Sequence, residues 1–78
     1  MKLLTVQSSN IANVGYDQEE LDLVVVFQNG QAYRYQDVPA DIALGLLTAP
    51  SHGAYFANYI KNRYVYEKID LAEENLHV

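Results

Sequence analysis

The chain has 78 residues, the size of one small domain, and its 10 acidic and 5 basic residues give a formal net charge of −5. This charge disfavours broad contact with polyanions such as duplex DNA or an anionic membrane. The absence of cysteine excludes disulfide bonds and thiolate zinc sites, and it is compatible with a reducing cytoplasm. The apolar run within residues 3–6 is too short for a signal peptide or a membrane span, so we expect a soluble, cytoplasmic protein.

Strands are predicted for the first half of the chain. Residues 3–6 indicate a short leading strand, and residues 11–17 indicate a second one in which Gly15 marks a bend or a bulge. A polar turn follows. Residues 21–28 then predict the longest strand, placed centrally in the sheet because it is rich in β-branched Val24, Val25 and Val26. Residues 31–36 form the second strand of a hairpin.

The Asn29-Gly30 pair between the last two strands predicts a β-hairpin with two competing registers. A two-residue turn would pair Phe27 with Ala32 and split the large apolar side chains between both faces. A three-residue loop with Gly30 left-handed in a bulge pairs Phe27 with Gln31 instead. We prefer this second register because it gathers the large apolar side chains on one face, namely Leu23, Val25, Phe27, Tyr33 and Tyr35.

Two helices are expected after the hairpin. The first covers about residues 39–48, where Pro39 suits the first turn and Gly45 is a weak point. Its apolar positions form one stripe, made of Ile42, Ala43, Leu46 and Leu47. Ser51 is expected to cap the second helix and Asn62 to take the left-handed position that ends it. The second stripe comprises Tyr55, Phe56, Tyr59 and Ile60. Residues 64–69 alternate in polarity and return as a strand.

These elements predict a single α+β domain in residues 1–69, with an antiparallel sheet of three to four strands and two helices packed on one face. Residues 70–78 form an acidic tail, either a frayed helical turn or disordered. The preferred register leaves Val24, Val26 and Ala32 on the face away from the helices. Because so small a domain needs additional stabilisation, we expect a homodimer formed through this patch; a monomer covered by its own leading strand is the alternative.

Short motifs follow one another along residues 6–69: Ser8-Ser9-Asn10-Ile11, Val14-Gly15-Tyr16-Asp17, Leu23-x-Val25-x-Phe27, Gly30, Tyr33-Arg34-Tyr35, Val38-Pro39, Ser51-x-Gly53-x-x-Phe56 and Ile60-x-x-x-Tyr64. In this order they resemble the KTSC domain. The resemblance implies a small domain that occurs free-standing in bacteria and phages and at the C-terminus of some lysyl-tRNA synthetases, with a proposed RNA- or nucleotide-related binding role. The chain departs from the family after the second helix. There the family often has Gly at the position of Asn62, and its segment is more basic than in this chain.

We do not expect this protein to be an enzyme. Ser8 and Ser9 could act as nucleophiles with His52 as base, but no nucleophile elbow or oxyanion loop surrounds them, and paired serines before a strand are ordinary turn formers. His52 and His77 alone cannot build a metal site. We therefore expect no catalytic residue, no metal and no cofactor. Gly53, near the start of the second helix, indicates the close approach of another backbone or of a ligand.

Tyr33 and Tyr35 could stack bases, as aromatic pairs do on RNA-binding sheets. In the preferred register they lie under the helices, and we expect them in the core. Arg34 then lies on the opposite face. There it either holds a phosphate or pairs with Asp22 or Asp37 as an ordinary surface residue.

Basic and aromatic side chains interleave around the end of the second helix, a mixture that suits single-stranded nucleic acid or a nucleotide: Tyr59, Lys61, Arg63, Tyr64, Tyr66 and Lys68. The alternative is a helix end with dipole-favoured cations followed by an amphipathic strand. For a phosphate-bearing ligand we expect the phosphates and base to be held by one set of residues: Arg34, His52, Lys61 and Arg63 at the phosphates, and Tyr64 or Tyr66 at the base.

Two functions stay open. The first is a small non-catalytic binding module for RNA or a nucleotide, as the resemblance implies. The second is a protein-interaction or phage-type inhibitor protein that docks its acidic surface on a host protein or, as an oligomer, sequesters a signalling nucleotide. Net charge favours the second class for large partners.

Overall fold

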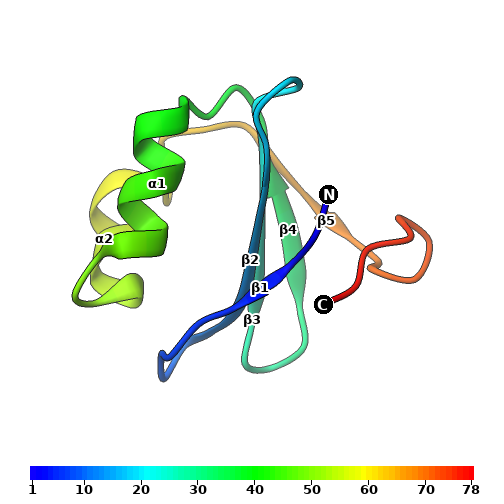
Figure 1. Ribbon diagram of the computed structural model, residues 1–78, viewed down its shortest axis with the longest axis horizontal. Coiled ribbons are helices and arrows are strands. Elements are labelled where there is room, and N and C mark those ends of the chain that lie inside the picture. Colours follow the sequence, from blue (N-terminus) through cyan, green and yellow to red (C-terminus); the bar gives the residue numbers. More distant parts are fainter.

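The computed structural model describes residues 1–78 as one antiparallel sheet with two helices packed on one of its faces (Figure 1). The elements in chain order are β1 Leu4–Thr5, β2 Ile11–Asp17, β3 Asp22–Phe27, β4 Ala32–Tyr35, α1 Ala40–Thr48, α2 His52–Tyr59 and β5 Tyr66–Ile69. The strand order is β1-β2-β3-β4-β5. The predicted α+β class is therefore confirmed.

The predicted count of three to four strands is wrong, because the sheet has five strands. Both short outer segments hydrogen-bond to a longer neighbour: β1 pairs with β2, and β5 pairs with β4. The strand β3 is central, as expected, although β2, with 7 residues, is longer than β3, with 6. No helix is long and apolar enough to cross a membrane.

The β3–β4 hairpin has the preferred register. Val25 pairs with Tyr33, and the backbone N–H of Phe27 donates to the carbonyl oxygen of Gln31 at 2.8 Å. Gly30 has a φ of +89°, the left-handed conformation that a three-residue loop requires at this position. The large apolar side chains of the hairpin consequently face the helices.

A β-bulge lies at Ala12 in β2. Ile11 pairs with Phe27 and Asn13 with Val26, so that Ala12 is the extra residue. Without the bulge, Ile11 and Val14 would point to opposite faces; with it, both are buried beneath the helices. Gly15, predicted to mark a bend or a bulge, is not a bulge, since it pairs regularly with Val24. The absence of a side chain there makes room for the N-terminal segment instead: a Cβ at Gly15 would lie 2.8 Å from Cδ2 of Leu3.

The main core lies between the sheet and the helices. Its buried members are Ile11, Val14, Leu23, Val25, Tyr35, Val38, Ala43, Leu46, Phe56 and Ile60. Burying an aliphatic side chain of this kind contributes roughly 1.5–3 kcal/mol, and this layer is therefore the principal source of stability. Tyr35 is only 5% exposed, which confirms that it belongs to the core, whereas Tyr33 is partly buried at its edge.

A second, smaller cluster covers the other face of the sheet. Leu3, Val24, Val26 and Ala32 are buried there, and Ile69, Leu71 and Leu76 pack against them. Residues 70–78 form a hydrogen-bonded turn over this cluster, and the N–H of Leu3 donates to the carbonyl oxygen of His77 at 3.2 Å. The patch proposed for self-association is thus covered by the chain itself. It no longer supports the expectation of a homo-oligomer.

The two helices contact each other at Gly45. Ser51 caps α2 by accepting a hydrogen bond from the N–H of Ala54 at 3.2 Å, and Asn62 has the predicted positive φ, of +64°. Gly45 lies against the Tyr55 ring, and a Cβ at this position would overlap the ring and its hydroxyl. The glycine that is a weak point by helix propensity is therefore required by packing.

We expect Gly45→Ala to lower the free energy of unfolding by roughly 1–3 kcal/mol because it overpacks the contact with Tyr55. Propensity alone would raise it by roughly 1 kcal/mol. Urea unfolding measures the difference. In a Tyr55→Ala background the overlap is gone, and the same change should then be stabilising. Stabilisation in the wild-type background would contradict this account of the helix contact.

The Tyr35 hydroxyl makes stability depend on alkaline pH. Burial, with smaller contributions from Tyr66 and Tyr33, raises the pKa of Tyr35 from 10.0 to about 12. The unfolded chain loses this proton near pH 10 and the folded chain only near pH 12, so the free energy of unfolding should fall across this interval. Urea unfolding measured at the two ends of this pH interval should show a smaller fall in the free energy of unfolding for Tyr35→Phe than for the wild type. An unchanged fall, or an equal effect of the control Tyr59→Phe, would contradict the assignment.

Candidate functional site

A cleft opens between α2 and the β3–β4 end of the sheet. It consists of two hollows that share Phe27, Phe56 and Lys61. The larger hollow, of about 490 Å³, is called the amide pocket because its uncharged polar lining is Ser9, Asn10, Gln28, Asn29 and Gln31. The smaller hollow, of about 260 Å³, is called the aromatic groove because it is completed by Tyr33, Tyr35 and Tyr66.

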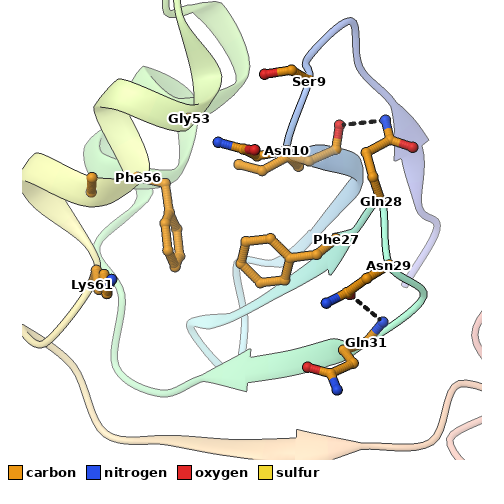
Figure 2. A pocket seen from close by; sticks show the side chains of 11 residues that line it. Ser9, Asn10, Phe27, Gln28, Asn29, Gln31, Gly53, Phe56 and Lys61 are labelled. Atoms are coloured by element: carbon orange, nitrogen blue, oxygen red, sulfur yellow. Dashed lines mark hydrogen bonds between the residues drawn. The ribbon is translucent and has the colours of Figure 1, made fainter.

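Two phenylalanine rings form the boundary between the hollows. Phe27 ends β3 and Phe56 comes from α2, and Figure 2 shows their rings facing each other across the cleft. The ring centroids are 5.3 Å apart in an edge-to-face arrangement. Because Phe56 is buried and both rings touch the main core, this part of the cleft is rigid apolar surface.

Backbone and side-chain hydrogen bonds build the amide pocket from segments far apart in the sequence. The Ser8 hydroxyl accepts from the N–H groups of Asn10 and Ile11, each at 3.2 Å, and shapes the turn before β2. The Gln28 side-chain amide then donates to the carbonyl oxygens of Ser8, at 3.1 Å, and Ile11, at 3.3 Å. These bonds join the turn to the end of β3, and the pocket lies between them and α2.

The aromatic groove is walled by tyrosines from the neighbouring strands β4 and β5. The Tyr66 ring lies 5.8 Å from the ring of Tyr33 and 5.4 Å from that of Tyr35. Tyr66 remains 53% exposed, so part of its ring is open to solvent. Lys61, two residues after the end of α2, lines the same groove and is exposed. All three salt bridges of the chain involve Arg34, so the Lys61 ammonium is unpaired.

Of the six predicted ligand-binding residues, the structure brings Lys61 and Tyr66 together in the aromatic groove. Three others have local structural contacts. The His52 Nδ1–H donates to the carbonyl oxygen of Leu46 at 2.7 Å and ties the two helices together, and the Arg63 Nε–H donates to the carbonyl oxygen of Asn58 at 3.0 Å. Tyr64 packs against the main core.

Arg34, the sixth predicted residue, lies on the other face of the sheet. It pairs with Val24, and its guanidinium contacts three carboxylates: Asp22 at 3.7 Å, Glu67 at 2.6 Å, and Glu74 of the C-terminal segment. The hydrogen bonds that Arg34 donates to Glu74 and Glu67 raise the pKa of Arg34 and outweigh the effect of desolvation. Arg34 therefore holds residues 70–78 on the sheet, and the cleft does not contain it.

The sequence analysis did not identify the amide pocket. Asn10, Gln28, Asn29 and Gln31 lie in two separate turns, and only the sheet register brings them beside α2. Gly53 was the one available signal. It was predicted to mark the close approach of a backbone or a ligand, but its neighbour within the chain is a side chain, since a Cβ there would lie 3.2 Å from Nδ2 of Asn10. Ser9 lines the pocket without a hydrogen-bonded base, and no group of three or more His, Cys, Asp or Glu residues is placed to hold a metal ion.

Comparisons with known proteins give consistent results. The family model of the KTSC domain matches residues 7–64. An uncharacterized protein of Stutzerimonas stutzeri is 41% identical over 71 residues, which are 90% of this chain and 100% of that protein. The lysine–tRNA ligase of Nostoc punctiforme is 33% identical over 67 residues, which are 86% of this chain but 12% of the ligase. The crystal structure of a KTSC domain protein from Yersinia pestis matches with a TM-score of 0.84 and 31% identity, over 88% of this chain and 97% of that one.

We expect Gly53→Ala to leave the free energy of unfolding unchanged or to raise it by up to about 1 kcal/mol. The only near neighbour of the added Cβ is the exposed amide of Asn10, which can move away. In NMR spectra the Asn10 side-chain NH₂ signals should shift while those of the core residues do not. Ala54→Gly on the adjacent exposed position measures propensity alone. A destabilisation by Gly53→Ala would contradict this geometry.

Proposed function

Because the chain belongs to the KTSC domain family and is similar to a segment of a lysine–tRNA ligase, we propose that it is a non-catalytic module that binds single-stranded RNA or a nucleotide. The ligand occupies the cleft between α2 and the sheet. The family relationship supports a binding role near RNA, and the cleft supplies the contacts that such a ligand needs.

The observation that carries this proposal is the unpaired Lys61 beside the open ring of Tyr66. A lysine ammonium attracts a phosphate, and an exposed tyrosine ring offers a stacking surface for a base, whatever the sequence. With Arg34 neutralised by carboxylates on the other face, Lys61 is the cation of the cleft. A single cation at a protein of net charge −5 suits one or two nucleotides, and not a duplex.

We favour this function over the protein-interaction or inhibitor role. The oligomer that would sequester a nucleotide depends on the patch of Val24, Val26 and Ala32, and that patch is buried under residues 70–78. The cleft, in contrast, is open and combines apolar rings with polar groups, as small-molecule sites do.

We expect Lys61→Ala to weaken the binding of a single-stranded RNA hexamer by about tenfold or more, because a charge-assisted contact contributes roughly 1.5–3 kcal/mol. Fluorescence anisotropy with labelled RNA measures the affinity. Tyr66→Ala should weaken binding through lost stacking, and the wild-type affinity should fall as salt rises.

Lys2→Ala is the matched control, since it changes the net charge equally at an exposed residue outside the cleft. An equal loss of affinity in Lys2→Ala would mean that only overall charge matters. Salt-independent binding, or binding unaffected by both Lys61→Ala and Tyr66→Ala, would remove the cleft as the RNA site.

A further inference from the structure

We propose that Lys68 is a second phosphate-binding residue, so that the ligand of the cleft is a single-stranded oligonucleotide and not a nucleoside monophosphate. This inference rests on the proposed RNA or nucleotide binding and adds the length class of the ligand. It follows from the place of Lys68 in the sheet, beside the rings of the aromatic groove.

The side chain of Lys68 lies on the helix face of β5. Its two neighbours in the strand point to the opposite face, since Glu67 contacts Arg34 there and Ile69 packs against the smaller cluster. Successive side chains of a strand alternate between the two faces. Lys68 therefore shares the helix face with Tyr66, which lies two positions earlier and roughly 7 Å away along the strand.

The register of the sheet places Lys68 beside the aromatic groove. Lys68 pairs with Tyr33, and Tyr33 lines the groove together with Lys61 and Tyr66. The Cβ atoms of directly paired residues lie about 5 Å apart on one face. The rings of Tyr33 and Tyr66 have centroids 5.8 Å apart. The long side chains of Lys61 and Lys68 can therefore both reach the surface that these two rings form.

Both lysines are free to bind a phosphate. Lys68 is exposed, and all three salt bridges of the chain belong to Arg34. None of the 10 acidic residues lines the amide pocket or the aromatic groove. On a chain of net charge −5, a surface that has Lys61 within it, Lys68 at its edge and no carboxylate in its lining is where a polyanionic strand is least repelled.

Acidic residues limit the path of the strand beyond Lys68. Asp70 and Glu73 line a separate hollow with Lys68, and they would repel a phosphate placed there. The path therefore runs from Lys61 across the exposed ring of Tyr66 and ends at Lys68. A nucleoside monophosphate has a single phosphate group and can occupy only one of the two lysines, whereas an oligonucleotide can occupy both and stack a base between them.

The salt dependence of binding to the full chain tests the proposal. The affinity for a labelled uridine hexamer is measured by fluorescence anisotropy over a range of salt concentrations. We expect Lys68→Gln to weaken binding about threefold or more. It should also reduce the slope of log affinity against log salt concentration by about 0.7, the value for one phosphate contact on a single strand. Lys68→Arg keeps the charge and should retain both the affinity and the slope of the wild type.

The length of the ligand is tested by competition. Unlabelled uridine monophosphate should bind the wild type at least tenfold more weakly than the hexamer does, because it lacks the second phosphate and the strand that links the two contacts. A monophosphate that binds as tightly as the hexamer would overturn the inference, since one phosphate group cannot occupy both lysines.

Lys2→Gln is the matched control, because Lys2 is exposed and lines neither hollow of the cleft. It should keep the wild-type affinity and slope. If Lys68→Gln behaves like Lys2→Gln while hexamer binding still depends on Lys61, the inference is overturned and the proposed function stands. The same conclusion holds if Lys68→Arg loses as much affinity as Lys68→Gln. If the hexamer does not bind the wild type, both are overturned.

Discussion

The left-handed backbone of Gly30 sets the register of the β3–β4 hairpin, and this register assigns every side chain of the two strands to a face of the sheet. Moving the pairing by one residue would place Leu23, Val25 and Phe27 on the face away from Tyr33 and Tyr35. The main core would then lose either Leu23 and Val25 or Tyr35. The bulge at Ala12 does the same for β2, because it turns both Ile11 and Val14 toward the helices.

The two faces of the sheet consequently have different roles. The helix face ends in the cleft, where rings from the core become partly accessible beside free amides and Lys61. The other face is closed by residues 70–78, which two leucines and the ion pair of Glu74 with Arg34 hold in place. Glu74 of this acidic segment thus neutralises Arg34 of β4. Lys61 remains as an unpaired positive charge in the cleft of an acidic protein.

The sequence predicted the hairpin register and both helices because turn residues and apolar periodicity act over a few neighbouring positions. It predicted Lys61 and Tyr66 together because they are close in the chain. It did not predict that Glu74 would meet Arg34, 40 positions earlier, which removed that arginine from the expected site. The amide pocket was missed for a similar reason, since its members come from three segments that only the folded sheet assembles.

The hydrogen bond between Leu3 and His77 brings the two ends of the domain side by side (Figure 1). A domain whose entry and exit points adjoin can be inserted into a loop of another protein without separating the ends of that loop. It also tolerates a covalent link between its own ends, with new termini opened in an exposed turn. This geometry makes the fold suited to use as a portable insert, with the cleft lying on the helix side of the sheet, away from the junction.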